Sequence, residues 1–289
     1  MINCPRCESE YNLAEKKCQH CGFAPEIIEG FPAWAPALAT DGSAYKLEYF
    51  SKLAELEESN FWFQARNALI GWALRKYHPN VKSFLEIGCG TGFVISAISK
   101  RFPESKMIGS EISSNALEFA SKRAPRAEFM QMDARHLPFV NEFDTVGIFD
   151  VLEHIPEDET VLRSIHRALI INGLLLVTVP QHPFLWSESD VHWSHVRRYT
   201  RAEIERKVSE AGFEIMRSSS FISLLLPIMA VARYFGKTNK EYDPFDELNL
   251  NPLLNKLLGI VLMLERVLIR LGVSFPVGGS RLIIARKVK

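Results

Sequence analysis

The segment FLEIGCGTGF, residues 84–93, restricts the fold more than any other part of the sequence. An apolar run with a single acid, Glu86, leads into glycines at positions 88, 90 and 92. Glycine lets a backbone turn sharply and approach a ligand closely. A strand that runs straight into a glycine turn is typical of α/β folds that bind a ligand at this turn.

Apolar strand patterns recur regularly after Pro79, separated by segments of helical pattern. This alternation indicates a parallel sheet covered by helices on both faces, with ligands bound beyond the carboxyl ends of the strands. We therefore expect an α/β, Rossmann-like fold with a seven-stranded sheet. The predicted strands cover residues 83–87, 106–111, 128–132, 143–149, 174–179, 213–218 and 281–285.

The spacing of the glycines argues against a dinucleotide. Dinucleotide-binding loops carry G-x-G-x-x-G, whereas this loop is G-x-G-x-G. Glu86 would repel a diphosphate but would favour a cationic ligand. S-adenosylmethionine, with its ammonium and sulfonium groups, fits better.

With these motifs the sequence resembles the class I S-adenosylmethionine-dependent methyltransferases over about residues 60–289. The resemblance implies that Glu111, in IGSEIS, binds the ribose hydroxyls and that Asp133, in QMDARHLPF, contacts the adenine amino group. Cys89 is expected to be a packing residue and not a nucleophile. The implied cofactor-binding residues are Glu86, Gly88, Cys89, Gly90, Gly92, Glu111, Ile112, Asp133, Ala134, Phe149 and Asp150.

The sequence FDTVGIFDVLEHI, residues 143–155, matches the fourth strand of this family and the loop that faces the transferred methyl group. The domain as a whole resembles methyltransferase type 11. Its Asp150-Val-Leu-Glu153-His154 is similar to the acid-x-x-Glu-His of the ubiquinone-pathway O-methyltransferases and of small-RNA 2'-O-methyltransferases. In these enzymes such residues hold a metal. The resemblance predicts that Asp150, Glu153, His154 and His195 bind a divalent metal (Mg, Mn or Fe) or supply a general base. In the alternative interpretation the two acids cap the following helix and His154 orients the substrate.

The acceptor side is less clear from the sequence. Residues 181–200, after the fifth predicted strand, are dense in polar and aromatic side chains. We expect this segment to line the substrate pocket, although any one of these residues could instead be a packed or solvated loop residue. The predicted substrate-binding residues are His192, Arg197, Arg198 and Tyr199.

Four of the five cysteines form two CxxC pairs, Cys4 with Cys7 and Cys18 with Cys21. Two such turns aim four thiolates at one point, as a tetrahedral zinc site requires. Disulfides are the less favoured interpretation, and His20 could replace one cysteine as a ligand. The segment resembles a zinc ribbon of about 24 residues, which is too short to fold without its metal.

The domain organisation follows from these segments. We expect a zinc ribbon at residues 1–24, a linker and N-terminal helices at 25–80, and the methyltransferase domain at 81–289. Residues 25–34 are predicted to be linker and 45–77 to be helical. An apolar helical insertion over about 221–276 contains two predicted helices, 221–235 and 252–271, whose wide apolar faces must be buried in protein, a dimer interface or a lipid headgroup layer.

Lys plus Arg and Asp plus Glu are both 34, so no overall positive charge attracts nucleic acid. No signal peptide or membrane-spanning stretch is recognisable, which places the chain in the cytoplasm, peripheral at the inner face of the membrane if the apolar helices dock there. The favoured hypothesis is methyl transfer to a hydroxyl of a small or lipid-linked acceptor. The alternatives are an RNA methyltransferase that uses the ribbon for recognition and a non-catalytic scaffold that binds the cofactor.

Overall fold

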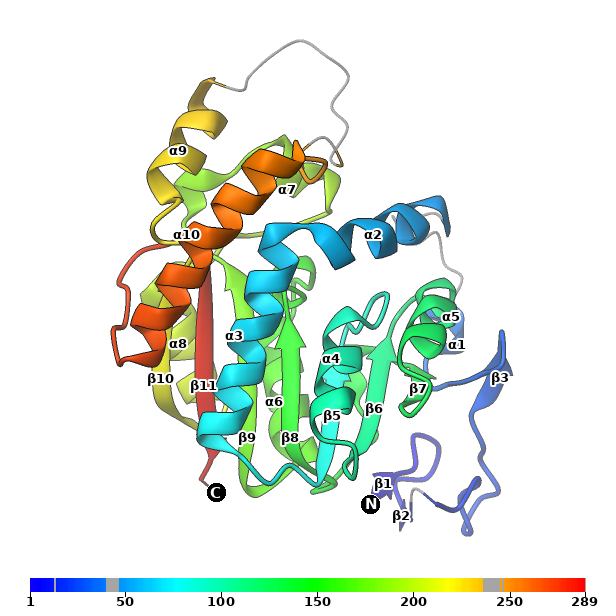
Figure 1. Cartoon of the computed structure of the whole chain (residues 1–289). Coiled ribbons are helices and arrows are strands. Elements are labelled where there is room, and N and C mark those ends of the chain that lie inside the picture. The colour runs from blue at the N-terminus through cyan, green and yellow to red at the C-terminus, as the bar shows by residue number, and fades with distance from the viewer. Residues whose placement is uncertain (13, 40–46, 236–244, 246, 289) are drawn as a thin grey trace.

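The computed structural model describes residues 1–12, 14–39, 47–235, 245 and 247–288. In this part of the chain the strands form a small two-stranded sheet, β1-β2, and a nine-stranded sheet in the order β10-β11-β9-β8-β5-β6-β7-β4-β3. Helices cover both faces of the large sheet (Figure 1). The α/β, Rossmann-like prediction is therefore confirmed.

Seven strands make the central part of the large sheet and match the seven predicted ones. The strand order reverses beside β5, which pairs with β6 on one side and β8 on the other. The strand β11 runs antiparallel to both of its neighbours, which the sequence pattern did not reveal. The bounds are β5 (Ser83–Ile87), β6 (Lys106–Glu111), β7 (Glu128–Gln131), β8 (Phe143–Phe149), β9 (Leu169–Pro180), β10 (Phe213–Phe221) and β11 (Ser280–Lys287).

Helices α3, α4 and α5 lie on one face of the sheet, and α6 and α8 lie on the other (Figure 1). Every residue of β8 is buried, as expected for a strand that is covered on both faces. The longer helices are α2 (Leu47–Ser59), α3 (Phe61–Tyr77), α4 (Phe93–Arg101), α5 (Ser114–Arg123), α6 (Asp158–Ala168) and α8 (Arg201–Glu210). Shorter ones are α1 (Pro36–Ala39), η1 (Ala134–His136), η2 (Leu152–His154), η3 (Pro183–Leu185) and α7 (Glu188–His192).

The predicted helical segment 45–77 is divided in two at Asn60. The backbone of Asn60 is extended, and its Oδ1 accepts a hydrogen bond at 2.9 Å from the backbone N–H of Trp62. Asn60 is therefore the N-cap of α3. The turn at this residue directs α2 over the carboxyl end of the sheet, while α3 packs along its face.

The predicted linker at residues 25–34 was wrong. These residues form a hairpin of β3 (Glu26–Ile28) and β4 (Phe31–Ala33), turning at Glu29 and Gly30, which both have positive φ. Strand β4 extends the sheet because Ala33 pairs with Gln131 of β7. This short segment is a strand because it pairs with the edge strand β7. Its sequence has no alternating apolar pattern from which the strand could be predicted.

The N-terminal ribbon packs against the body of the molecule. It contains β1 (Ile2–Asn3) and β2 (Glu10–Tyr11). Ile2 bridges to Phe139, and the backbone N–H of Asn3 donates to the carbonyl oxygen of Pro138 at 2.7 Å. Residues 138 and 139 precede β8, so the ribbon lies near the amino end of that strand, at the bottom of Figure 1.

Two apolar helices follow β10. The first, α9 (Leu226–Phe235), begins five residues later than the predicted start at Phe221, because Phe221 completes β10 by pairing with Ser280. The second, α10 (Pro252–Arg270), confirms the prediction and lies across α3 (Figure 1).

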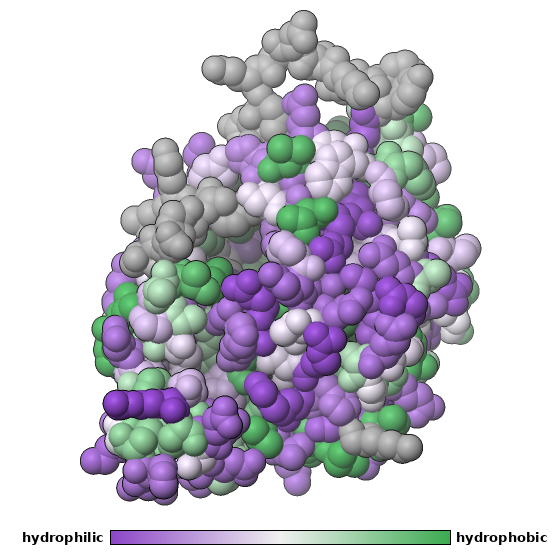
Figure 2. All heavy atoms as spheres, turned by 180° about the vertical axis from the view of Figure 1, so that it is seen from behind, coloured by the Kyte–Doolittle hydropathy of each residue, from purple (hydrophilic) through white to green (hydrophobic). Residues whose placement is uncertain are grey.

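The apolar face of α10 is wider than the part of it that packs against the rest of the protein. Leu262 and Ile269 are buried, whereas the side chains of Leu253, Leu257 and Leu264 are exposed. The opposite side of the molecule is largely hydrophilic (Figure 2). Among the residues that the structure describes, no helix combines the length and the hydropathy that crossing a bilayer requires.

Candidate active site

A cavity of about 1400 Å³ opens at the carboxyl ends of β5, β6, β7 and β8. This is the crevice that the reversal of strand order creates. Loops that follow these strands form its floor, and residues of α2, α3, α9 and α10 form its apolar walls. Wall residues include Phe50, Leu53, Phe61, Trp62, Phe63, Leu225, Ile228, Met229 and Leu258.

The glycine loop approaches the cavity closely. Gly90 has a φ of +51°, and the space where a Cβ would stand is open. Gly92 has a φ of +78°, and a Cβ there would lie 2.7 Å from the backbone of Ala120 in α5. Gly90 is thus free for ligand approach, whereas Gly92 allows α4 to pack on α5 and lies outside the cavity lining.

Glu111 ends β6 at the cavity. Its carboxylate accepts hydrogen bonds from the backbone N–H groups of Gly90 at 3.0 Å, Ile112 at 2.8 Å and Ser113 at 3.3 Å. Burial raises the pKa of Glu111, although these donors oppose the rise. The carboxylate therefore connects the glycine loop to the place where the family binds the ribose.

Asp133 lies at the end of β7 and caps η1. Its carboxylate accepts hydrogen bonds from the backbone N–H of Arg135 at 2.9 Å and from the Nε of Arg135 at 3.0 Å. Asp133 is therefore a helix cap in addition to its expected place in the cofactor site. Asp133 and Ala134 also line the cavity, so the hydrogen bonds of the cap fix a loop that faces the ligand site.

Glu86 is 2% exposed, and its Oε2 has no hydrogen-bond partner among the described residues. Burial raises the pKa of this carboxyl well above its ordinary value. A buried carboxyl without a hydrogen-bond partner is unfavourable in free energy. A ligand with a cationic hydrogen-bond donor would supply that partner and would stabilise the ionised form of Glu86. The residues at this end of the cavity thus fit S-adenosylmethionine.

Asp150 follows β8 with a left-handed backbone, at a φ of +56°. Its Oδ2 accepts a hydrogen bond at 3.0 Å from Thr178 and pairs with the guanidinium of Arg66 from α3. The ring of Trp62 lies 4.6 Å from that guanidinium. Both partners contact the same oxygen of Asp150, and Asp150 is not among the residues whose potential ligand atoms gather within 4.8 Å of one another.

Glu153, His154 and His195 gather beside Asp150, with one potential ligand atom of each within 4.8 Å of the others. The imidazoles of His154 and His195 meet edge to face, with 4.7 Å between ring centroids. Burial and the neighbouring His195 lower the pKa of His154 to about 4. Burial and the Asp150 carboxylate raise the pKa of Glu153 well above its ordinary value. At neutral pH the imidazole of His154 is therefore neutral, and burial favours the neutral form of Glu153.

Asp190, which was not singled out from the sequence, orients His195. It is 0% exposed, and its Oδ1 lies 2.8 Å from the Nδ1 of His195. Burial favours its neutral form, but the hydrogen bonds and charges of His195 and Arg198 hold the pKa of Asp190 well below its usual range. The carboxylate thus fixes one ring nitrogen of His195 and leaves the other for the cavity. The local signal for Asp190 was the capping box of α7, Ser187 to Asp190.

Glu57 of α2 is a second residue that the sequence did not reveal. Its carboxylate accepts hydrogen bonds from the hydroxyl of Thr91, in the glycine loop, and from Arg123 of α5 at 2.5 Å. Arg123 also donates to the carbonyl oxygen of Ala54 at 2.7 Å. These contacts hold α2 over the cofactor end of the cavity, and no pattern within residues 47–59 predicts them.

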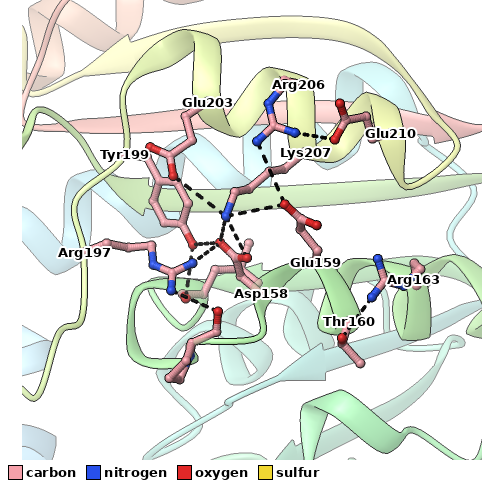
Figure 3. Close-up of polar contacts among 12 residues, drawn as sticks. Asp158, Glu159, Thr160, Arg163, Arg197, Tyr199, Glu203, Arg206, Lys207 and Glu210 are labelled. Carbon is pink, nitrogen blue, oxygen red and sulfur yellow. Dashed lines mark hydrogen bonds and ion pairs between the residues drawn. The ribbon is translucent and has the colours of Figure 1, made fainter.

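Of the four predicted substrate-binding residues, Arg198 lines the cavity. Arg197 and Tyr199 point away from it and contact Asp158 at the start of α6, at 2.6 Å each (Figure 3). Lys207 of α8 donates to the same carboxylate. Their predicted role against the substrate is corrected to that of anchors for the loop, because Asp158 satisfies their polar groups.

His192 also lies outside the cavity lining. Its Nε2 is 2.6 Å from the hydroxyl oxygen of Tyr49, and the two rings stack. Tyr49 itself faces the cavity, so His192 supports the wall from behind. Apart from His192, Arg197, Tyr199 and Gly92, the predicted cofactor, catalytic and substrate residues all line the cavity.

The four N-terminal cysteines converge, with 3.5 Å between the sulfurs of Cys4 and Cys21 and 3.6 Å between those of Cys7 and Cys18. They are free thiols and not disulfides. Such a cluster of four sulfurs fits a tetrahedral zinc ion. His20 is exposed and is not part of the cluster.

Comparison with known proteins agrees with the geometry. Residues 85–177 match the family model of a methyltransferase domain. A "Probable S-adenosylmethionine-dependent methyltransferase" of Mycobacterium tuberculosis is 25% identical over 203 residues, which are 67% of this chain and 71% of the relative. A demethylmenaquinone methyltransferase of Thermotoga maritima is 31% identical over 99 residues, 34% of this chain and 43% of that protein.

A solved structure adds support for the fold. The phosphoethanolamine N-methyltransferase 2 of Haemonchus contortus, in complex with S-adenosyl-L-methionine, superposes with a TM-score of 0.59 at 20% identity. The match covers 86% of this chain and 59% of that one. The glycine loop, the acids after successive strands and the matched family model together identify the chain as a class I S-adenosylmethionine-dependent methyltransferase with an N-terminal four-cysteine cluster.

Proposed function

We propose that the protein transfers the methyl group of S-adenosylmethionine to a hydroxyl of a small or lipid-linked acceptor. The observation that carries this proposal is the cluster that Glu153 and His154, in η2 after β8, form with His195, in the loop after α7, inside the cofactor cavity. When bound, the cofactor supplies an electrophilic methyl group. The chain's task is to hold the nucleophile in line with it and to remove a proton.

His154 is the group of the cluster that is available to accept that proton, although its lowered pKa also makes it a weaker base than a free imidazole. Its lowered pKa of about 4 keeps the imidazole neutral at physiological pH. His195, held by Asp190, lies against it and can orient the ring or the acceptor. A hydroxyl must lose its proton during the transfer, which is the step that such a base assists.

A divalent metal is the second candidate for the same cluster. The ligand atoms of Glu153, His154 and His195 lie within 4.8 Å of one another, which suits one ion with open positions for an acceptor. Such a metal would lower the pKa of the acceptor hydroxyl as a Lewis acid. Treatment with a chelator distinguishes the two roles. It should abolish turnover if the cluster binds a metal and leave turnover unchanged if His154 acts as a base without a metal.

The apolar walls of the cavity favour an acceptor with a large apolar part. Ile228, Met229 and Ala232 of α9 line the cavity, and Ile228 is also 62% exposed. Helix α9 therefore joins the cavity wall to the outer surface.

We propose that an anionic lipid surface covers the exposed faces of α9 and α10. Their only acid among the described residues, Glu265, is buried, whereas Lys256 and Arg270 are exposed. A homodimer through α10 is the alternative outcome.

We also propose that one structural zinc ion binds Cys4, Cys7, Cys18 and Cys21. No described residue of the ribbon lines the cavity, and the hydrogen bond from Asn3 joins the ribbon to a residue that precedes β8. This placement does not favour the ribbon as the recognition module of an RNA methyltransferase. RNA thus remains the less favoured acceptor.

The experiment that tests the function begins with lipids and metabolites from cells that lack the protein. The purified protein and S-adenosylmethionine with a labelled methyl group should transfer label to one compound of that extract. With the acceptor known, His154→Ala should lower kcat by about 100-fold or more while the affinity for S-adenosylhomocysteine stays unchanged. Activity that survives both this substitution and exhaustive chelation would contradict both catalytic roles. Absence of any labelled product would favour a non-catalytic scaffold.

A further inference from the structure

Two arginines from separate elements meet at one buried carboxylate in the cavity wall. The Nε of Arg198, in the loop before α8, lies 2.7 Å from the Oδ1 of Asp190. The Nη1 of Arg233, on α9, lies 3.3 Å from the Oδ2 of the same residue. Both arginines line the cavity.

The two arginines share an ion-pair partner. In the described part of the chain, Asp190 is the one carboxylate paired with either arginine. It also accepts hydrogen bonds from His195 and from the backbone N–H and hydroxyl of Ser187. Two guanidinium groups thus share a carboxylate that is already saturated with donors. Glu153, whose charge also acts on Arg198, forms no ion pair with either arginine, so both guanidinium groups can pair with a further anion.

Donor groups of the arginines are left over. The hydrogen bonds found here use the Nε and Nη1 of Arg198 and the Nη1 of Arg233, the last also donating to the carbonyl oxygen of Leu185. Among the described residues, no hydrogen bond uses the Nη2 group of Arg198 or of Arg233, so these groups can donate to a ligand. Burial and the charge of Arg233 lower the pKa of Arg198, which agrees with two cations held close together.

We propose that Arg198 and Arg233 bind an anionic group of the methyl acceptor, a phosphate or a carboxylate. Planar guanidinium groups match the oxygens of both anions and bind them with paired, charge-assisted hydrogen bonds. The proposal rests on the proposed function in one respect, that this cavity holds the acceptor. Asp190 contacts both Arg198 and His195, so the anion would be bound next to the cluster that acts on the hydroxyl.

The acceptor that fits is an anionic amphiphile. Arg233 lies one helical turn after Met229 on α9, and Met229 forms part of the apolar wall. The charged head and the apolar part of the acceptor therefore have adjoining subsites. The arginines would select the head group, and α9 and α10 would accommodate the apolar chain.

The test is calorimetric binding of three monomeric amphiphiles to the full chain saturated with S-adenosylhomocysteine. Octyl phosphate and octanoate carry the two candidate anions, and octyl glucoside is the neutral control. We expect at least one anionic compound to bind about tenfold or more tightly than octyl glucoside, and the tighter of the two names the anion. Arg233→Gln should remove this preference, whereas Arg233→Lys should keep part of it.

Arg163→Gln, an exposed arginine of α6 outside the cavity, is the matched control and should leave the three affinities unchanged. Equal affinity for the three compounds, or an anion preference that persists in Arg233→Gln, would overturn the proposal and leave methyl transfer unaffected. Failure to bind S-adenosylhomocysteine in the first titration would count against the proposed function instead. The amphiphile preference would still decide the role of the arginines.

Discussion

Glu111 illustrates how one side chain serves both the fold and the ligand. Its carboxylate holds the backbone N–H of Gly90, and it ends β6 where the ribose of the cofactor is expected. The hydrogen bond from Gly90 stabilises the glycine loop, which must keep positive φ angles at Gly88 and Gly90, and those from Ile112 and Ser113 stabilise the turn that follows β6. Loop geometry and cofactor affinity should therefore change together.

The first prediction concerns this residue. Glu111→Ala should weaken binding of S-adenosylhomocysteine by about tenfold or more, because it removes a charged acceptor of hydrogen bonds from both ligand and loop. Isothermal titration calorimetry measures the change. Glu118→Ala, on the exposed face of α5, should not alter the affinity. An unchanged affinity in Glu111→Ala would argue against the assigned cofactor site.

At the scale of elements, Asp158 connects α6 to α8 and to the loop that carries Arg198. It is 2% exposed and accepts hydrogen bonds from Lys207, Tyr199 and Arg197 (Figure 3). Burial favours its neutral form, but these donors prevail and lower the pKa of Asp158. The network positions the acceptor side of the cavity without touching it.

The second prediction is that Asp158→Asn lowers the free energy of unfolding by about 3 kcal/mol at pH 7, because it leaves Lys207 buried beside a neutral group. Since the folded-state pKa of Asp158 lies below that of the unfolded chain, its contribution is present above about pH 4 and is lost as the pH falls through the folded value. Urea unfolding at pH 7 and at lower pH should show the difference shrinking on acidification. Glu159→Gln, at an exposed neighbour, should stay within about 0.5 kcal/mol of wild type.

The third prediction concerns α10. The protein should float with liposomes of anionic lipid at low salt, and Leu257→Asp or Leu264→Asp should reduce the floated fraction, because both side chains are exposed on the apolar face. Leu262 is unsuitable for this test, since it is 2% exposed and packs in the core. Failure of the wild-type protein to float, together with a dimeric mass in solution, would assign the face to a second copy.

At the scale of the whole molecule, the ribbon is continuous with the main core. Ile2, Tyr11, Cys4 and Cys18 belong to the same buried cluster as Phe139 and the strands of the sheet. A segment of this size cannot fold on a core of its own. Metal binding at the cysteines should therefore contribute to the stability of the entire chain.

The fourth prediction follows from this continuity. Metal analysis should find about one zinc per chain, and Cys18→Ser should lower both the zinc content and the Tm, the latter by about 5 °C or more. His20→Ala should change neither, because His20 is outside the cluster. A zinc-free preparation whose residues 1–24 resist protease and whose Tm equals that of the zinc-containing protein would contradict the structural role.

The sequence by itself determined the α/β class, the seven predicted strands of the large sheet, the order of the acids along the cavity and the two CxxC motifs of the ribbon. These features are local, because strand periodicity, a glycine turn and a CxxC spacing each depend on neighbours along the chain. Glu86, Glu111 and Glu153 were found for that reason. The hairpin at residues 26–33, in contrast, depends on pairing with β7, a distant edge strand.

Only the tertiary structure decided which polar groups of residues 181–200 face the cavity. Arg197, Arg198 and Tyr199 are adjacent in sequence but have different partners. Arg197 and Tyr199 form hydrogen bonds with Asp158, outside the cavity lining, whereas Arg198 pairs with Asp190 in the cavity wall. Arg233, a lone cation in an apolar segment, acquires its place only because α9 folds back beside Asp190. A side chain's partner depends on which distant carboxylate the fold brings within hydrogen-bond distance, and no local pattern records that distance.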